Sequence, residues 1–327
     1  MMAQLRLNPR GLVQGESMSD GRSQRRSDYE RGFERCVVTF IDILGYRNLL
    51  NTRTANEIVG IVNALRTFTQ GDGERDTRPT RSDEVRLYSQ AFSESVSDAV
   101  VRVRTVDTQS NDGAFVLELI DLMHVMLECV NRGILIRGGM TIGPVHVGLA
   151  GDGPIFGNGM VRAFKIESEE PVYPRIMIDD AALEDYLADE ALWQDGNFDA
   201  DEARLVRQFV GMAEDGSHFV DYLKAAGPGE FDAGVAGHFE FLQRHRRVII
   251  DNMANADPKA QRKLVWLANY HNRYVVDLQE QYDMEDASGE FYAELEVSPE
   301  EIFGGLMIEG SWTDISARLA GIAAGES

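Results

Sequence analysis

The sequence has few cysteines, no long hydrophobic run, and fewer basic than acidic residues. Cys36 and Cys129 are its two cysteines. Because each lies within an apolar stretch, we expect buried free thiols rather than a disulfide framework or a cysteine metal site. No apolar stretch approaches the ~20 residues that a membrane-spanning helix needs, and no signal peptide is recognisable. These features predict a soluble, cytoplasmic protein that does not act in a membrane.

Positive charge is scarce. The 327 residues include 32 Lys and Arg against 54 Asp and Glu, a formal net charge of −22. Nucleic acids and anionic membranes are bound by broad basic surfaces, so this balance argues against both as partners. Hydrophobic residues make up 43% of the chain and charged residues 26%, as in an ordinary globular protein. An acidic protein that handles phosphorylated substrates must therefore gather a few cations at one place.

Composition divides the chain into three regions. Residues 1–32 are rich in Arg, Ser, Gly and Asp without an apolar period, which predicts a disordered segment, with Met18 as a candidate natural start. Residues 33–180 alternate strand-like and helix-like patterns and form the candidate catalytic domain. Residues 181–327 are acidic and mainly helical in pattern, so we expect a C-terminal helical extension.

The middle region has the element order strand, helix, two strands, helix, strand, with one further strand and helix inserted. The expected strands are 36–42, 85–92, 95–104, 134–142, 145–149 and 175–178, with a turn at 92–96 and a hairpin across Gly143 and Pro144. The expected helices are one capped by Thr54, then 114–130, 160–169 and, in the extension, 258–277. This order predicts an α+β fold, a ferredoxin-like palm with an antiparallel sheet and helices on one face.

Two aspartates in strand-like stretches are candidate metal ligands. Asp42 ends the first apolar strand shortly before Gly45, and Asp98 follows the expected turn between the next two strands. A carboxylate beside Ile and Val loses hydration, which a cation or hydrogen-bond donors must offset. These strands are neighbours in a palm, so the carboxylates would repel unless one is protonated or a divalent cation lies between them. Taken alone, Asp42 could equally cap the following helix.

Three cations follow in the same region. Arg137 interrupts the apolar strand 134–142, where its guanidinium would suit triphosphate oxygens or pair with a nearby Glu or Asp. Arg162 and Lys165 lie three residues apart on the helix that follows the glycines of 157–159, so they share one helical face near backbone N–H groups that are free for an anion. The alternative is an amphipathic helix with solvated charges.

Together these segments resemble class III nucleotidyl cyclases over residues 36–178. The resemblance implies that Asp42 and Asp98 hold two Mn²⁺ or Mg²⁺ ions per site, aided by the backbone carbonyl of Ile43. Two such ions activate the attacking oxygen and neutralise the leaving diphosphate.

The same resemblance implies the nucleotide contacts. Arg137 matches the arginine that binds triphosphate oxygens, and Ser97, in place of the family's usual glycine, is a candidate nucleotide contact. The transition-state asparagine and arginine of the family fall on Val161 and Lys165. A lysine keeps the charge but loses the bidentate fork, so Arg162 could share or take over the catalytic role of Lys165.

The adenine-selecting Lys and Asp of the family fall on Glu94 and Pro154, which argues against an ordinary adenylate cyclase. The chain more specifically resembles the bacterial pyrimidine (uridylate and cytidylate) cyclases of the Pycsar antiphage systems. That likeness lies in Asp42–Tyr46, Ser95–Asp98, Arg137–Met140, Ala163–Glu167 and Trp266–His271. It implies that Tyr46 reads the base by narrowing the pocket, although Tyr46 could equally be a core aromatic beside a turn.

The resemblance also implies a homodimer with two composite sites, one subunit providing the aspartates and the other the cationic helix. We expect conversion of UTP to 3′,5′-cyclic UMP and diphosphate, with cyclic UMP activating a separately encoded effector in antiphage defence. A cytidylate cyclase, a purine nucleotide cyclase and a domain that only binds nucleotide are the alternatives. A diguanylate cyclase shares the palm fold, but its G-G-[DE]-E-F signature is absent, and a purely structural protein would leave the aspartate pair unexplained.

Overall fold

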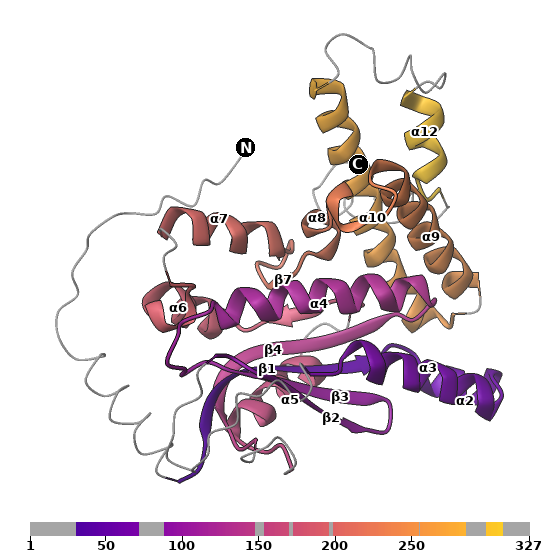
Figure 1. Ribbon diagram of the computed structural model, residues 1–327. Coiled ribbons are helices and arrows are strands. Elements are labelled where there is room, and N and C mark those ends of the chain that lie inside the picture. The colour runs from indigo at the N-terminus through magenta and orange to yellow at the C-terminus, as the bar shows by residue number, and fades with distance from the viewer. Residues whose placement is uncertain are drawn as a thin grey trace, which may run out of the picture.

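The computed structural model describes residues 31–71, 88–147, 154–169, 173–195, 199–254, 256–285 and 299–309. All but two residues of the segment 1–32, predicted to be disordered, lie outside these ranges. The fold is α+β and contains one mixed seven-stranded sheet, which confirms the predicted class (Figure 1). None of the helices in the described ranges is both long and apolar enough to cross a membrane.

The sheet has the strand order β2-β3-β1-β4-β5-β7-β6. Its strands are β1 (Glu34–Ile43), β2 (Ala91–Val96), β3 (Ala99–Thr105), β4 (Ile136–Val145), β5 (Ile176–Ile178), β6 (Val210–Met212) and β7 (His218–Val220). The pair β4–β5 is parallel and the other neighbours are antiparallel. Because β7 pairs with β5, residues on both sides of position 180 belong to one sheet.

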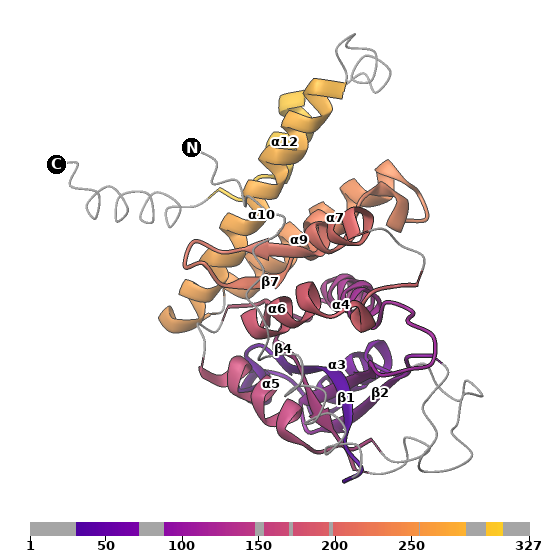
Figure 2. The same ribbon diagram turned by 90° about the vertical axis from the view of Figure 1, so that its left-hand side faces the viewer.

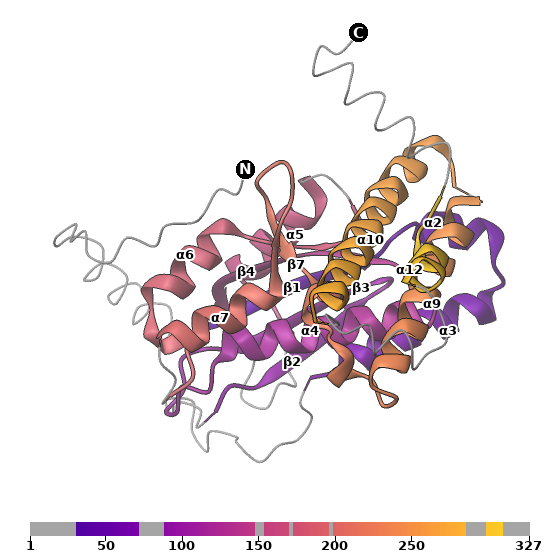
Figure 3. The same cartoon turned by 90° about the horizontal axis from the view of Figure 1, so that it is seen from above.

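Helices cover both faces of this sheet. They are α2 (Tyr46–Thr52), α3 (Ala55–Phe68), α4 (Ala114–Asn131), α5 (Asn158–Glu169), α6 (Asp180–Ala188), α7 (Asp199–Phe209), α8 (Tyr222–Ala225), α9 (Val235–Ala254), α10 (Pro258–Glu285) and α12 (Pro299–Leu306), with 3₁₀ turns at Glu190–Leu192 and Pro228–Glu230. Figure 1 shows α4 on one face of the sheet and α5 on the opposite face. Seen from above, α7, α9 and α10 lie on the α4 side (Figure 3). The expectation that the helices share one face is therefore wrong for α5.

Local sequence signals explain several helix ends. Thr54 and Glu57 form a capping box at the start of α3, because each side chain accepts a hydrogen bond from the other's backbone N–H. Gly133 has a φ of 73°, and the next N–H, of Ile134, donates to the carbonyl of Cys129, which closes α4. Both cysteines are buried and free, as predicted.

Strand β1 divides its side chains between two cores. Val37 and Ile41 face the main core under α4, whereas Val38 and Phe40 belong to a second cluster. This second cluster also contains Ala163 of α5. Successive side chains of a strand point to opposite faces, so a continuous apolar run is what a strand covered on both faces requires.

Strand β4 is one continuous strand, where the sequence predicted a hairpin across Gly143 and Pro144. It pairs with β1 along its whole length, including the partners Cys36 and Gly143. The other neighbour, β5, pairs with only Gly138 to Met140, so Pro144 lies where β4 is an edge strand. Proline is tolerated at such an edge because no neighbouring strand needs its missing N–H.

Two arginines of β3 are buried under α4, which alternation along the strand did not reveal. Arg102 and Arg104 donate to Glu118 of α4 at 2.9 and 3.2 Å, and both also contact Asp121. Arg102 further donates to the carbonyls of Thr69 and Gln70. Removing one member would leave buried charge unpaired, so we interpret this network as structural.

The C-terminal region is held by a directional chain of buried hydrogen bonds. The Tyr222 hydroxyl lies 2.5 Å from Nε2 of His245, and the Nδ1 atoms of His245 and His271 are 2.9 Å apart. Nε2 of His271 lies 3.0 Å from the carbonyl oxygen of Leu306. With both imidazoles neutral, each group in this chain donates to the next, so α8, α9, α10 and α12 are joined.

Candidate active site

Asp42 lies at the end of β1, on the sheet face that α5 covers. Side chains alternate along a strand, so Asp42 shares its face with Phe40, which packs in the α5-side cluster. The chain leaves the strand through Gly45, whose φ of 77° is left-handed. In the β1–β4 pair, Asp42 lies directly opposite Arg137. The sheet register thus brings these two predicted site residues together.

Arg137 is held by two carboxylates. Its Nε and Nη2 atoms donate to Oδ2 of Asp42 at 3.0 and 2.7 Å. Nη2 also lies 2.8 Å from Oε1 of Glu167, a buried oxygen of α5 that has no well-aligned hydrogen bond in the described part of the chain. This is the pairing with local acids that the sequence left open. The guanidinium therefore links β1, β4 and α5.

Asp98 lies close enough to Asp42 to influence its protonation. Burial raises the pKa of Asp42 above its ordinary value, the hydrogen bond from Arg137 opposes that rise, and the charge of Asp98 adds to it. Nε and Nη2 of Arg137 both donate to Oδ2 of Asp42, so Oδ1 is the Asp42 oxygen that this arginine leaves for a cation. The two aspartates form an acidic pair at one end of the β1–β3 ladder.

Ser97 and Asp98 form the turn between β2 and β3, since Val96 and Ala99 are the last paired residues. The turn was expected at 92–96, and the expectation that Asp98 lies within a strand is wrong. Ser97 has a φ of 59°, and no other non-glycine residue in the described ranges has a positive φ. A Cβ is unfavourable in that region, so glycine would adopt this turn without strain.

The donor set at this place suits a hard divalent cation. Carboxylates of Asp42 and Asp98 and the carbonyl of Ile43 are oxygen ligands of the kind that Mg²⁺ and Mn²⁺ take. The Ile43 side chain is buried in the main core, so only its backbone could contribute. Within the described residues there is no group of three or more His, Cys, Asp or Glu that could hold a metal ion. A site here would rest on two carboxylates completed by phosphate oxygens and water.

The two cations of α5 are not joined to the aspartate pair by any ion pair among the described residues. Arg162 is bidentate to Asp179, at 2.8 and 2.7 Å, and lowers the pKa of that carboxyl group. Lys165 is exposed and lies 3.8 Å from Glu169, one turn further along the helix. In the described part of the chain, the predicted catalytic pair therefore has Asp179 and Glu169 as its ion-pair partners rather than the two aspartates.

The glycines near these cations have packing reasons. A Cβ on Gly139 would lie 2.4 Å from the carbonyl oxygen of Ala163, so glycine lets α5 approach β4 closely. Gly157 has a φ of 153°, and a Cβ there would lie 2.4 Å from the carbonyl of Pro144. These glycines are explained without an anion at the start of α5.

Among the predicted base-reading positions, Tyr46 is half-buried and packs against the main core. Glu94 and Pro154, the positions that select adenine in the resembling family, are neighbours in space. The Glu94 carboxylate accepts a hydrogen bond of 2.7 Å from the N–H of Ile155, the residue after Pro154. Tyr46 thus also has the structural role that the sequence analysis kept as an alternative.

Two residues of this region escaped the sequence analysis. Glu167 had been noted only as part of a motif, yet its carboxylate contacts Arg137. Burial raises the pKa of Glu167 above its ordinary value. Lys263, in α10 of the extension, acts electrostatically on both Arg137 and Glu167. No local pattern could have joined Lys263 to residues about a hundred positions earlier.

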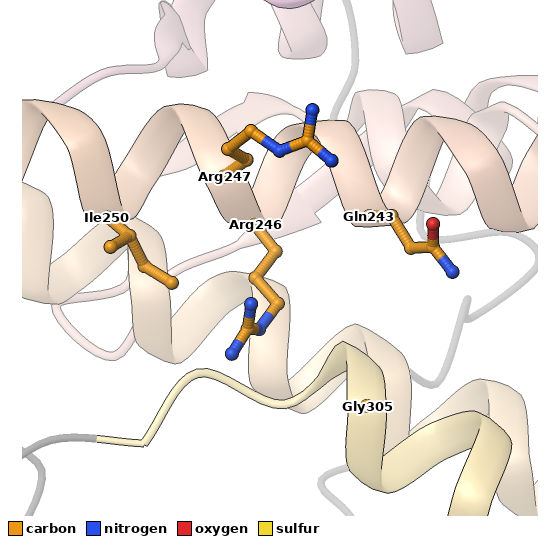
Figure 4. Close-up of a pocket in the computed structure, with 5 residues that line it drawn as sticks. All are labelled: Gln243, Arg246, Arg247, Ile250 and Gly305. Atoms are coloured by element: carbon orange, nitrogen blue, oxygen red, sulfur yellow. The ribbon is translucent and has the colours of Figure 1, made fainter.

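A pocket of about 280 Å³ lies elsewhere, between α9 and α12 (Figure 4). It is lined by Gln243, Arg246, Arg247, Ile250 and Gly305. In Figure 4 the Arg246 side chain points toward α12, and its Nε donates to the carbonyl of Met307. The Arg247 side chain points away from Gly305, so the two guanidinium groups do not converge. None of the predicted site residues lines this pocket.

Comparison with known proteins provides no independent assignment. No protein-family model matches the chain, and no curated protein matches it significantly.

Proposed function

We propose that this protein is a pyrimidine nucleotide cyclase of the class III type, which converts UTP to 3′,5′-cyclic UMP and diphosphate. The observation that carries the proposal is the meeting of Asp42, Asp98 and Arg137 at one end of the central strands. A half-buried acidic pair with an arginine beside it offers ligands for divalent cations and for phosphate oxygens. The order β2-β3-β1-β4 of the first four strands supports the ferredoxin-like palm that such an enzyme needs.

Each residue would act through position and charge. Asp42, Asp98 and the Ile43 carbonyl would hold two Mn²⁺ or Mg²⁺ ions, which when bound activate the ribose 3′-oxygen and neutralise the diphosphate. Arg137 would exchange its bond to Asp42 for triphosphate oxygens. Ser97, in the turn beside Asp98, would contact the nucleotide through its backbone or hydroxyl. The step needs no covalent intermediate, since the 3′-oxygen attacks the α-phosphorus and diphosphate leaves.

The catalytic cations would come from a second copy of the chain. Arg162 and Lys165 lie on a surface of α5 that also exposes Val161 and Phe164, at 64% and 50%. Phe156 adds a third exposed apolar side chain just before α5. Exposed apolar groups gathered around functional cations are typical of an interface. A homodimer would cover them and bring these cations to the partner's aspartates.

Base selection would depend on Tyr46 and on the neighbourhood of Glu94. A carboxylate at position 94 accepts hydrogen bonds, so it suits the N3–H of uracil or the amino group of cytosine. CTP is therefore the second candidate substrate. The resemblance to Pycsar cyclases extends the proposal to cyclic UMP as a cytoplasmic second messenger in antiphage defence, read by a separately encoded effector.

One observation favours a different function, a domain that binds nucleotide without turnover. Arg137 neutralises Asp42 within the chain, so the aspartate pair is tolerated without a metal ion. Catalysis requires that nucleotide and metal ions displace this ion pair.

The test is to incubate the pure protein with equimolar ATP, GTP, CTP and UTP and Mn²⁺, and to identify products by mass spectrometry. Cyclic UMP with equimolar diphosphate is the expected result, and Asp98→Asn is the matched variant that keeps the side-chain shape. Dominant cyclic AMP or cyclic GMP would refute the pyrimidine assignment. Nucleotide binding without any cyclic product would support the other candidate function, a domain that binds nucleotide without turnover.

A further inference from the structure

The site around Asp42 carries more negative than positive charge. The carboxylates of Asp42 and Glu167 contact the guanidinium of Arg137, and the charge of Asp98 acts on Asp42. A triphosphate would bring still more negative charge to this place. Among the described residues, the α5 cations form their ion pairs with Asp179 and Glu169 and not with these aspartates. Beside the metal ions of the proposed function, a further protein cation near Arg137 would favour anion binding.

The first turns of α10 come close to this site. Trp266 of α10 stacks on Tyr173 at 5.4 Å between ring centroids and lies 5.0 Å from the guanidinium carbon of Arg175. The carbonyl of Arg175 in turn accepts the N–H of Gly138, the residue after Arg137. Figure 2 shows the lower end of α10 near the C-terminal end of α5. The aromatic contacts thus fix α10 beside β4 and α5.

Lys263 lies on α10 one turn before Trp266, so the two side chains share a helix face. Trp266 docks this face of α10 on Tyr173 and Arg175, beside β4. The charges of Arg137 and Glu167 act on Lys263. Lys263 is half-buried. Within the described residues it makes no hydrogen bond or ion pair. An ammonium group that loses hydration without a partner is unfavourable, unless a bound anion completes its environment.

We propose that Lys263 binds phosphate groups beside Arg137, so that the C-terminal extension completes the substrate site of its own chain. The identification of the ligand as a nucleoside triphosphate rests on the proposed function, whereas the affinity for a polyphosphate anion does not. The alternative role, balancing the charge of Glu167, predicts an effect on stability without an effect on anion affinity.

The experiment measures binding of inorganic tripolyphosphate with Mg²⁺ to the full chain by isothermal titration calorimetry. Lys263→Ala should weaken binding about ten- to a hundredfold, the loss expected for one charge-assisted contact. Lys263→Arg should recover most of the affinity. Arg262→Ala is the matched control, because it removes the same charge at the adjacent, exposed position and should change affinity less than about threefold. Circular dichroism checks that each variant folds.

Two results would overturn the inference. If the unmutated protein does not bind tripolyphosphate, or if Lys263→Ala and Arg262→Ala weaken binding equally, Lys263 is no phosphate ligand. If Lys263→Ala is unfolded, the comparison of Lys263→Met with Lys263→Arg decides the question, because both keep a long stem. Loss of affinity in Lys263→Met in a protein that makes no cyclic nucleotide would support the inference while refuting the proposed function.

Discussion

The hydrogen-bonded chain through His245 and His271 predicts that acid destabilises the C-terminal helices. Burial lowers the pKa of His271 from its ordinary 6.5 to about 4, with a smaller effect from the nearby charge of Arg246. Burial and its histidine neighbour lower the pKa of His245 as well. The folded form of each residue is therefore the neutral one, because Nδ1 of His271 accepts a bond that a second proton would remove.

The magnitude follows from the change in pKa. A depressed histidine pKa contributes stability that is fully present above pH 6.5 and is lost as the pH falls through that value toward 4. At 1.36 kcal/mol per unit, His271 alone accounts for a loss of about 3 kcal/mol over this window. His245 contributes in the same direction. Between these two pH values, the titration of His271 lowers the free energy of unfolding by up to about 1.4 kcal/mol for each unit of falling pH.

The assay is urea unfolding followed by far-ultraviolet circular dichroism between pH 7.5 and 4.5. His271→Gln should be less stable than the unmutated protein at pH 7.5, and the difference should shrink as the pH falls. Asn272→Ala is the matched control, because it removes hydrogen bonds between α10 and Ile308 without removing a titratable group. Its stability difference should be the same at every pH. A constant difference for His271→Gln would refute the reasoning.

The other predictions concern the proposed catalytic site. Asp42→Ala or Asp98→Ala should abolish formation of cyclic nucleotide in a folded protein, and near-normal turnover in either would remove the metal assignment. A chain carrying Asp42→Ala and a chain carrying Lys165→Ala should each be inactive alone but recover activity when mixed, since their heterodimer keeps one intact site. No recovery despite subunit exchange would argue for sites within one chain. Ser97→Gly should raise the free energy of unfolding by about 0.5–1 kcal/mol, because glycine adopts the φ of 59° without strain, and a lower stability in urea would contradict this. Tyr46→Ala should lower pyrimidine cyclisation and admit some ATP or GTP, and unchanged product ratios by mass spectrometry would exclude it as the base reader.

Local signals in the sequence determined the helices and the first strand. The box of Thr54 and Glu57 fixed the start of α3, and Gly133 fixed the end of α4, because these signals act within one turn of the chain. Helix α10 begins at the predicted Pro258 but continues eight residues past the predicted end, to Glu285. A helix end without a glycine or proline leaves little trace in the sequence.

The candidate site was predicted in part. The sequence identified Asp42 and Arg137 as unusual because each charge interrupts an apolar strand, and the register of β1 and β4 makes them partners. It misplaced the turn at Asp98, because a left-handed serine at position 97 carries no turn signal of its own.

Only the tertiary structure decided which faces of the strands are covered and which distant segments contact them. Alternation along β3 does not reveal which face is covered, so the burial of Arg102 under Glu118 depended on where α4 packs. Strands β6 and β7 are three residues each, too short for a period to be detected, and they exist because β5 offers an edge to pair with. The C-terminal extension lies beside the middle region because Trp266 of α10 docks on Arg175. Contacts between residues distant in sequence depend on packing, which no local pattern encodes.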